Sequence, residues 1–255
     1  MTLDFTGQTA IVTGAAHGFG RAIAVAFAER GAQVWACDVL ADELRETEAL
    51  CRQAGGVCQV SITDVRNRAA VDACAAAAAA ATGHVDILVN NAGGVLGQVG
   101  RPLEQVTPDE WRAIFDVNVT GAFYFAQAVS PGMKAARAGR IVNISSGAGL
   151  GISLTGIQAY ASAKAAQIGL TRQLAHELGP WGITVNNIAP GFVRSNPTTE
   201  RQWASYGEDG QRALVDRIAL KRLGTSNDIA HGVLFFASDY AGWITGQVIA
   251  IDGGK

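Results

Sequence analysis

The sequence predicts an α/β fold with a single Rossmann-type, doubly wound parallel sheet of about seven strands flanked by helices. Short apolar runs of strand length alternate with longer helical stretches along the 255 residues, and such alternation indicates parallel strands joined by helical crossovers. The runs are apolar at successive positions, as in strands covered on both faces. The length suits one domain and no linker or repeat is evident, so we expect residues 1–255 to form a single domain.

Seven apolar runs of strand length define the expected strands. The first five-residue run directly precedes a glycine-rich turn, and the second ends at an aspartate. The last run lies four residues before the end of the chain. The expected strands are Thr9–Thr13, Gln33–Asp38, Val57–Ile62, Asp86–Val89, Arg140–Ile144, Thr184–Ile188 and Val248–Ile251.

Longer stretches between these runs define the expected helices. Gly31 ends the first of them, and an unbroken alanine run from Ala75 to Ala81 gives the third a high helix propensity. A polar segment, residues 194–223, is expected to form one or two short helices. The expected long helices are Arg21–Arg30, Ala41–Ala54, Arg68–Thr82, Pro108–Arg137, Ala159–Leu178 and Asp228–Ala237.

Composition and charge exclude several functional classes. The formal net charge is −2, so we expect neither nucleic acid nor a membrane as a partner. No apolar run approaches the roughly 20 residues of a membrane helix, and Met1–Gly7 lacks the features of a signal peptide. The four cysteines form no CxxC pair, which predicts reduced thiols in a cytoplasmic protein and no metal site.

A glycine-rich turn, Thr13–Gly20, follows the first expected strand and opens the first helix. The free N–H groups and the dipole of a helix start favour a pyrophosphate there, and glycines let the backbone approach it. The alternative is that the glycines merely punctuate the chain, but the strand before and the helix after favour cofactor binding. The expected cofactor-binding residues of this turn are Gly14, His17, Gly18, Phe19 and Gly20.

Asp38 ends the second expected strand, 24 residues after Gly14. A carboxylate at this place can accept the ribose hydroxyls of an adenosine and would repel a 2′-phosphate. No Lys or Arg stands at position 17 or directly after Asp38 to attract that phosphate, so we expect NAD as the cofactor rather than NADP. The alternative is that Asp38 begins a loop or caps the next helix.

Tyr160 and Lys164 stand one helical turn apart in the helix expected at Ala159–Leu178. A phenol is a poor acid or base near neutral pH, because its usual pKa is about 10, and a neighbouring ammonium favours the phenolate. The pair therefore predicts a general acid and base. Ser145 and Ser146 end an apolar run just upstream, and together these groups predict proton transfer at a carbonyl or hydroxyl.

These motifs resemble, in order and in spacing, the classical short-chain dehydrogenase/reductase family, over nearly the whole chain from about Thr6 to Gly254. The glycine turn, Asn90-Asn91-Ala92-Gly93 after the fourth expected strand, and Tyr160-x3-Lys164 carry the resemblance. Further matching motifs are Asp64-Val65, Asn118-Val119-Thr120-Gly121, Ile144-Ser145-Ser146, Pro190-Gly191 and Asp252-Gly253-Gly254.

The resemblance implies an NAD-dependent oxidoreductase that transfers hydride between nicotinamide and a secondary alcohol or ketone. Tyr160 would be the acid in reduction and the base in oxidation, while Lys164 would lower the tyrosine pKa and bind the nicotinamide ribose. Ser146 would orient the reacting oxygen, and Asn118 would hold a helix kink and a water. The further cofactor contacts that it implies are Asp64, Val65, Asn91, Ala92, Gly93, Pro190, Gly191, Val193 and Ser195.

The serine departs slightly from the family spacing. Ser146 lies one residue farther from Tyr160 than the family usually places its serine, and Ser145 lies two residues farther. The glycine-rich run from Gly147 to Ser153 can absorb one extra residue. We favour Ser146 because it follows the strand in the usual register, and Ser145 stays a candidate.

Substrate specificity is expected to come from loops around the site and from a lid at residues 194–222. The lid is polar and aromatic, which favours a sugar, polyol or sugar acid, and Arg194 or Arg201 would bind a carboxylate at two points. A 3-oxoacyl thioester is the second expectation and a steroid-like alcohol the third, while the alternative for each lid residue is a solvated helix face. The expected substrate residues are Gly94, Ser146, Ala148, Gln158, Arg194 and Trp203.

Subunit contacts are expected because charged residues make up only 16% of the chain, below the usual quarter. Aromatic residues along the helix after Pro108, together with the resemblance, predict a homotetramer, and the strand Val248–Ile251 would contribute to a second interface. A non-catalytic dinucleotide-binding sensor is the alternative of another class, but it would not need the complete serine, tyrosine and lysine set. The aromatic residues are Trp111, Phe115, Phe123 and Phe125.

Overall fold

The computed structural model describes residues 3–255 and contains a seven-stranded parallel sheet. Its strand order is β3-β2-β1-β4-β5-β6-β7, which confirms the expected doubly wound sheet. The strands are β1 Thr9–Thr13, β2 Gln33–Asp38, β3 Val57–Ile62, β4 Ile87–Asn90, β5 Gly139–Ile144, β6 Ile183–Pro190 and β7 Val248–Ile251.

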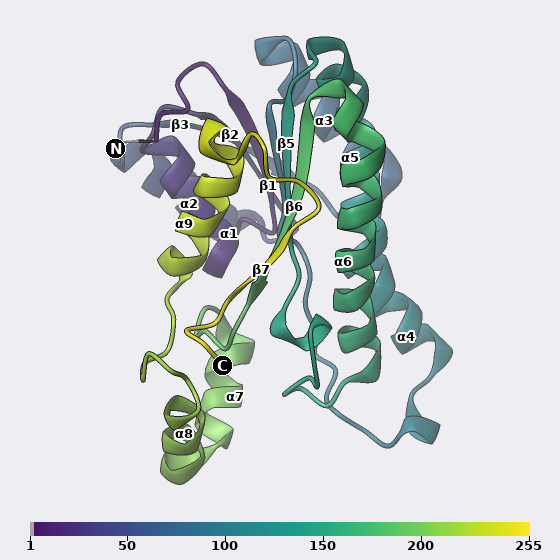
Figure 1. Ribbon diagram of the computed structural model, residues 1–255, viewed down its shortest axis with the longest axis vertical. Helices are drawn as coiled ribbons and strands as arrows, with labels where there is room; N and C mark the ends of the chain where they lie inside the picture. The colour runs from purple at the N-terminus through teal and green to yellow at the C-terminus, as the bar shows by residue number, and fades with distance from the viewer. Residues whose placement is uncertain (1–2) are drawn as a thin grey trace.

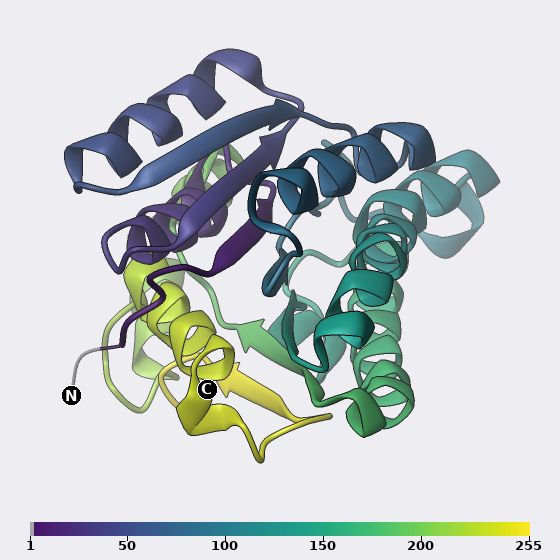
Figure 2. The same ribbon diagram turned by 90° about the horizontal axis from the view of Figure 1, so that it is seen from above.

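Helices cover both faces of the sheet (Figure 1, Figure 2). On one face α1 packs against α2 and α9, and on the other α3, α5 and α6 pack together with α4 beside α6. Within residues 3–255 no helix is both long and apolar enough to cross a membrane. The helices are α1 Gly18–Ala28, α2 Ala41–Gln53, α3 Arg68–Thr82, α4 Pro108–Phe115, α5 Gly121–Ala136, α6 Gln158–Leu178, α7 Pro197–Ser205, α8 Gly207–Asp216 and α9 Ser226–Ala237.

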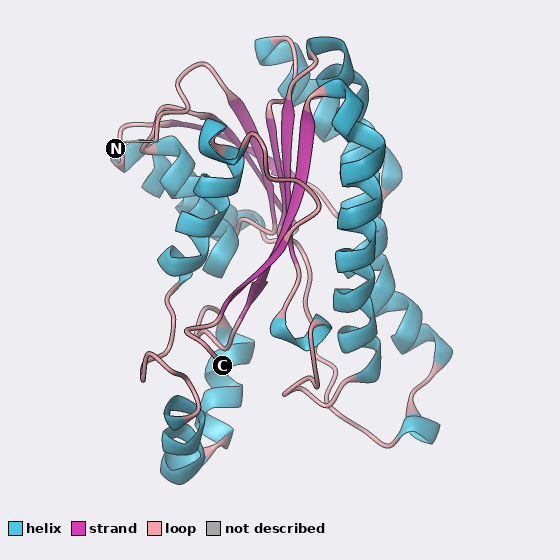
Figure 3. Cartoon of the chain, in the orientation of Figure 1, coloured by secondary structure: helices cyan, strands magenta, loops and turns pink. Residues whose placement is uncertain are grey.

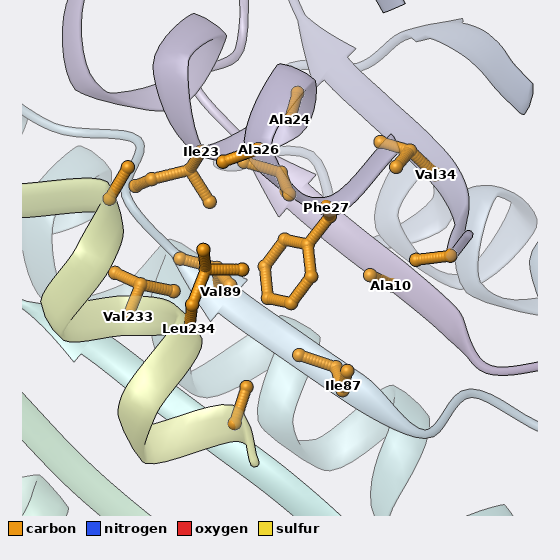
Figure 4. Packing of buried hydrophobic residues seen from close by; sticks show 14 of the residues in the cluster. Ala10, Ile23, Ala24, Ala26, Phe27, Val34, Ile87, Val89, Val233 and Leu234 are labelled. Carbon is orange, nitrogen blue, oxygen red and sulfur yellow. The ribbon is translucent and has the colours of Figure 1, made fainter. Parts of the chain in front are cut away.

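Apolar packing between the sheet and α1 and α9 holds the first face together (Figure 4). Phe27 of α1 points toward the strands, where Ile87 and Val89 of β4 lie, and Val233 and Leu234 of α9 complete the cluster. All five side chains are buried, and each contributes about 1.5–3 kcal/mol relative to an exposed one. This packing holds α1 against the sheet, with the glycine turn leading into its first residue, Gly18.

The chain reverses its direction of winding between β1 and β4, which are neighbours in the sheet but not in the sequence. Ligands of doubly wound sheets bind outside the carboxyl ends of the strands at such a point. Because the strands are parallel, their carboxyl ends share one edge, where the loops after β4, β5 and β6 gather with α7 and α8 (Figure 3). The fold therefore gathers the glycine turn and the expected catalytic loops at one edge.

The clearest differences from the expected helices are at three places. α1 begins at Gly18, one turn early, because the glycine turn leads directly into the helix. The helix expected over residues 108–137 is divided by a π-helical turn, Asp116–Thr120, into α4 and α5. α9 begins at Ser226, where Thr225 and Asp228 form a capping box. The polar segment forms two short helices, α7 and α8, as expected.

Candidate active site

The glycine turn between β1 and α1 leaves room for a ligand because its glycines exclude side chains. Gly14 and Gly18 have positive φ angles of 65° and 59°, in the left-handed region that favours glycine. A Cβ at Gly20 would lie 2.0 Å from the carbonyl oxygen of Gly14, so the first turn of α1 packs directly on the loop. The N-terminal N–H groups of the 11-residue α1 are thus held beside bare backbone, which fits the diphosphate of a dinucleotide.

Asn91, which follows β4, holds the glycine turn in place. Its Nδ2 donates to the carbonyl oxygens of Thr13 and Gly14, each at 3.0 Å. The Thr13 hydroxyl in turn accepts from the backbone N–H groups of Asn91 and Ala92, each at 3.0 Å. These bonds join the carboxyl ends of β1 and β4, so the structure brings the expected cofactor residues of the two loops together.

Asp38 at the end of β2 faces the same turn. Its Oδ2 accepts from the N–H of Ala16 at 3.0 Å, and its Oδ1 accepts from Val39 at 2.7 Å and from Leu40 at 3.2 Å. Three N–H donors fix the orientation of this carboxylate. Asp38 therefore does begin the loop after β2, and it also lies against the glycine turn.

The basic side chains beside the glycine turn are already engaged. His17 Nδ1 lies 2.6 Å from a carboxylate oxygen of Glu43. Arg21 Nε donates to the carbonyl oxygen of Ala16 at 2.9 Å, and Arg21 Nη2 donates to the Glu46 carboxylate at 2.9 Å. Neither group is free to meet an additional phosphate at the end of β2.

Asp64 and Val65 follow β3 at the same sheet edge. The Asp64 carboxylate pairs with the Arg66 guanidinium at 2.7 Å, and this hydrogen bond lowers the pKa of Asp64. Val65 is buried against the start of α5, where a Cβ at Gly121 would lie 2.6 Å from its side chain. Both residues lie where expected, but the carboxylate already has an intramolecular partner.

Ser146 and Tyr160 meet between the end of β5 and the first turn of α6. Burial raises the pKa of the Tyr160 phenol, and the neighbouring Ser146 side chain acts in the opposite direction. Ser146 Oγ also accepts from the N–H of Ala148 at 3.1 Å. Ser145, by contrast, is buried and donates to the amide oxygen of Asn187 on β6. The geometry therefore favours Ser146 over Ser145 as the serine beside the tyrosine.

Lys164 is buried one turn further along α6. Its Nζ donates to the carbonyl oxygen of Ile144 at 3.0 Å and to Oε1 of Gln167 at 2.9 Å. The same nitrogen lies 5.8 Å from the centroid of the Tyr160 ring. Lys164 therefore connects α6 to the strand end that carries the serines.

The expected direction of the tyrosine pKa shift is not found. Burial lowers the pKa of Lys164 to about 7, so near neutral pH its positive charge is only partly present. The pKa of Tyr160 is raised rather than lowered, because desolvation of the phenolate outweighs the stabilising contacts. The spacing of the two residues is as expected, but the extent of their burial could not be predicted from the sequence.

Asn118 occupies the π-helical turn between α4 and α5. Its Nδ2 donates to the carbonyl oxygens of Ile114 at 2.8 Å and Gly94 at 2.9 Å, while its Oδ1 accepts from the N–H of Gly94 at 3.0 Å. A Cβ at Gly93 would lie 2.5 Å from Asn118 Oδ1 and 3.1 Å from Lys164 Nζ. The helix irregularity thus carries Asn118 to the loop that borders Lys164, and this agrees with the kink expected there.

The segment after β6 crosses the sheet edge toward the glycine turn. The N–H of Gly191 donates to the carbonyl oxygen of Ile251 at 3.0 Å, which fixes the segment beside β7. A Cβ at Gly18 would lie 2.7 Å from the carbonyl oxygen of Ser195. The expected residues of this segment are Pro190, Gly191, Val193 and Ser195.

The start of the lid is held by its own side chains. Arg194 pairs with Glu200 through two nitrogens, the shorter distance being 2.8 Å, and its guanidinium carbon lies 5.7 Å from the Trp203 ring centroid. Trp203 also stacks on Phe192, with ring centroids 6.0 Å apart. The Arg194 guanidinium thus already has an internal carboxylate partner, and binding of a substrate carboxylate by Arg194 or Arg201 stays a prediction.

Other expected substrate residues border the site mainly through their backbone. Gly94 is bound by the Asn118 amide, and Ala148 donates to Ser146. The Gln158 side chain donates to the carbonyl oxygen of Arg101 at 2.9 Å, so it joins two loops.

Two residues near the site, Gln167 and Phe192, were not predicted from the sequence. Gln167 contacts Lys164 directly, and its signal was a polar residue three positions after the lysine, on the same helix face. Phe192 supports Trp203 and also lies 5.9 Å from the Tyr206 ring centroid, but an aromatic residue after Pro190-Gly191 carried no distinctive pattern. In the described part of the chain, no group of three or more His, Cys, Asp or Glu side chains could hold a metal ion, and the four cysteines are buried free thiols.

Comparisons with known proteins agree with this geometry. Residues 14–255 match the family model described as enoyl-(acyl carrier protein) reductase. The chain is 40% identical over 253 residues to the (2S)-[(R)-hydroxy(phenyl)methyl]succinyl-CoA dehydrogenase subunit BbsD of Thauera aromatica, covering 99% of this chain and 98% of the relative. It is 36% identical over 253 residues to the 3-oxoacyl-[acyl-carrier-protein] reductase FabG of Escherichia coli, with the same coverage. A crystal structure of NAD⁺-bound xylitol dehydrogenase superposes with a TM-score of 0.91 and 31% identity, covering 98% of this chain and 99% of that chain.

We predict that Lys164→Met changes stability in a pH-dependent way. The lysine pKa falls from 10.5 to about 7 on folding, so folding disfavours the ammonium fully below pH 7 and not at all well above pH 10.5. The free energy of unfolding of the variant relative to the parent should therefore rise by a few kcal/mol as the pH falls from 10.5 to 7. Urea unfolding at several pH values measures this difference.

Lys221→Met, which replaces an exposed lysine, is the control for this series. Loss of the contacts made by Lys164 shifts the free energy of unfolding of Lys164→Met by a similar amount at every pH. Only the pH dependence of the difference from the parent is therefore diagnostic. A flat difference between Lys164→Met and the parent would show that the lysine is not desolvated in the folded protein.

Proposed function

The chain belongs to the classical short-chain dehydrogenase/reductase family, and we propose that it is an NAD-dependent oxidoreductase acting on a secondary alcohol or its ketone. One observation carries the proposal: the glycine cradle between β1 and α1 shares a sheet edge with Ser146, Tyr160 and Lys164. A dinucleotide-binding surface thus borders a proton-transfer group. A non-catalytic sensor would have no use for the second part.

The side chains divide the work of carbonyl reduction among them. A bound nicotinamide supplies or accepts the hydride. The Tyr160 phenol donates its proton to the substrate oxygen, and the Ser146 hydroxyl donates a hydrogen bond that stabilises the negative charge developing there. Because burial raises the pKa of Tyr160, the phenol keeps its proton at neutral pH, which suits the donor role.

Alcohol oxidation requires the reverse transfer, in which the Tyr160 phenolate accepts the hydroxyl proton. The Lys164 ammonium one turn away favours the phenolate when it is charged. Asn118, through its bonds to Gly94, holds the loop that borders the ammonium. We expect oxidation to gain rate as the pH rises toward the range in which the phenol ionises.

The preference for NAD over NADP is supported by the charges near the end of β2. Asp38 presents a carboxylate beside the glycine turn, and a 2′-phosphate placed there would be repelled. The nearest candidates for phosphate ligands, His17 and Arg21, are engaged by Glu43 and Glu46. A structural neighbour is described as NAD⁺-bound, which agrees with this preference.

Two substrate classes fit different segments around the site, one the polar lid and the other the loops after β4 and β5. A sugar, polyol or sugar acid would suit the polar lid, and a xylitol dehydrogenase is a structural neighbour. However, one of the two lid cations expected to bind a carboxylate, Arg194, is paired with Glu200. That pairing weakens the case for a sugar acid more than the case for a neutral polyol.

A 3-oxoacyl thioester or another ketone with an apolar body is the second candidate, and exposed apolar side chains favour it. The loops that follow β4 and β5 flank Gly94 and Ser146, and they carry leucine and isoleucine side chains that are exposed, Ile152 completely so. Relatives named as acting on a CoA thioester and on a 3-oxoacyl thioester fit this class. The exposed residues are Leu96, Leu150, Ile152 and Leu154.

We also propose that the protein is a cytoplasmic homotetramer. Two exposed apolar surfaces support the contacts between subunits. Trp111 of α4 and Phe123 of α5 are 39% and 41% exposed, whereas Phe125 is buried in the core. Near the edge strand β7, Trp243 is 99% and Ile249 is 42% exposed. Large apolar side chains in this number at two places favour contacts between subunits.

The proposed reaction is tested by mixing the protein with NAD or NADP and a panel of alcohols, and by following absorbance of the reduced nicotinamide. The panel contains polyols, sugars, 3-hydroxyacyl thioesters and simple apolar secondary alcohols. We expect reduction of NAD by a secondary alcohol of one of these classes. Ile152→Ser should raise KM for a thioester or apolar alcohol several-fold and leave KM for a polyol unchanged, which separates the two classes.

We predict that Tyr160→Phe abolishes turnover and leaves NADH binding nearly intact. Phenylalanine keeps the ring and its packing but removes the proton that the substrate oxygen needs. Loss of general acid and base catalysis lowers the rate by about 10²–10⁴-fold. Steady-state rates and NADH fluorescence titration measure the two effects, and retained turnover would remove Tyr160 as the proton carrier.

We predict that Asp38→Ala weakens the use of NAD and relaxes discrimination against NADP. The variant loses both the acceptor for the adenosine ribose and the charge that repels a 2′-phosphate. Asp38→Asn is the matched control, because it retains an acceptor for Ala16 but has no charge. The ratio of kcat/KM for the two cofactors is the measurement, and an unmodified protein that already prefers NADP would contradict this role of Asp38.

A further inference from the structure

Gln167 is a fully buried polar residue in the middle of α6. Its relative exposure is 0%, and its Oε1 accepts from Lys164 Nζ at 2.9 Å. Its Nε2 is buried without a hydrogen-bond partner among the described residues. A buried amide with an unpaired donor is unfavourable for folding. The residue therefore gains its hydrogen bonding from the contact between its oxygen and Lys164, and we ask what that contact does.

The contact places Lys164 between two neighbours on one face of α6. Tyr160 lies one turn before the lysine and Gln167 one turn after it, because residues three and four apart share a helix face. The ammonium also reaches across to the carbonyl oxygen of Ile144 on β5. Gln167 is the side chain that binds Lys164 from the direction away from the tyrosine.

We propose that Gln167 is a positioning residue for Lys164, holding its ammonium by the side-chain oxygen at a fixed place between the tyrosine and the end of β5. The proposal rests on the assigned role of Lys164 in the reaction. Gln167 itself touches neither the substrate nor the reacting atoms. It acts by reducing the number of positions open to the lysine and by stabilising its charged form.

Among the neighbours of Lys164 named below, none other than Gln167 presents a side-chain oxygen that accepts a hydrogen bond from the ammonium. On α6 the titratable neighbour is Tyr160, the π-helical turn presents the neutral amide of Asn118, and the loop after β4 presents Gly93. The end of β5 presents a backbone carbonyl. Burial is the cause that lowers the lysine pKa, and no charged side chain of the described residues opposes it, so a hydrogen-bond acceptor has a measurable effect.

The test is to titrate the lysine directly in the protein free of cofactor. The chain contains four lysines, so protein grown with [ε-¹³C]lysine gives four signals in a carbon–proton NMR spectrum. The Lys164 signal is assigned by its disappearance in Lys164→Met. Its chemical shift against pH reports protonation of this amine without any need for turnover.

Two variants should move the Lys164 midpoint in opposite directions. Gln167→Met keeps the length of the side chain but removes the acceptor, and should lower the midpoint by about one pH unit, the amount that a charge-assisted hydrogen bond can supply. Gln167→Glu adds a carboxylate and should raise it. A merely structural role for Gln167 would not reverse the sign between the two variants.

Thr171→Val is the matched control, because Thr171 is a buried polar residue one turn further along α6. Its hydroxyl accepts from Asn143 and Asn187 and donates to the backbone carbonyl of Gln167, not to Lys164 or to the Gln167 side chain. The variant should leave the Lys164 midpoint unchanged. Equal midpoints in the parent, Gln167→Met and Gln167→Glu, or shifts of the same sign in both variants, would overturn the proposal.

A kinetic readout separates this proposal from the proposed reaction. If the protein is the expected oxidoreductase, Gln167→Met should lower kcat and move the pH profile of kcat/KM in the same sense as the NMR midpoint. Shifted midpoints in a protein that turns over no secondary alcohol would uphold the role of Gln167 and refute the reaction.

Discussion

The burial of the Lys164 ammonium is the constraint on which the active-site geometry depends. A cation removed from water requires oxygen acceptors close by, and here a β5 carbonyl and the Gln167 side chain provide them. The neighbouring loop must also stay clear, because a side chain at Gly93 would collide with Asn118 and crowd the ammonium. One buried charge thereby fixes α6, the end of β5, the loop after β4 and the π-helical turn relative to one another.

At the glycine turn, side chains that are neutral or negatively charged form hydrogen bonds with the N–H and C=O groups of the loop backbone. Asn91 and Thr13 exchange hydrogen bonds across the ends of β4 and β1, and Asp38 binds the N–H of Ala16. These side chains replace the sheet ladder where it stops, so the loop is rigid while its glycines stay bare. Side chains from three strand ends thus hold the turn in place, and the glycines leave its backbone accessible.

The sequence predicted the sheet and the location of the site well because both depend on local patterns. Continuous apolar runs and a glycine turn indicate parallel strands and the edge where their ends meet, and Tyr160 and Lys164 are a fixed distance apart on any helix. The family resemblance implied a helix kink at Asn118, but its form as a π-helical turn could not be predicted, since the bonds of Asn118 to Ile114 and Gly94 depend on tertiary packing. The same holds for the tyrosine pKa, which depends on burial that spacing alone does not reveal.

The substrate was harder to predict because the side chains that would meet it belong to loops whose internal pairing decides what they can bind. Arg194 has the chemistry of a carboxylate ligand, but Glu200 and Trp203 occupy its charge and its face. The lid is also tied to the cofactor cradle, where the carbonyl oxygen of Ser195 fills the space that a side chain at Gly18 would need. The absence of a side chain at that glycine therefore leaves room for the lid, as well as for the diphosphate of the proposed cofactor. The presence of a glycine at position 18 does not by itself distinguish between these two roles, and in this fold the same glycine serves both.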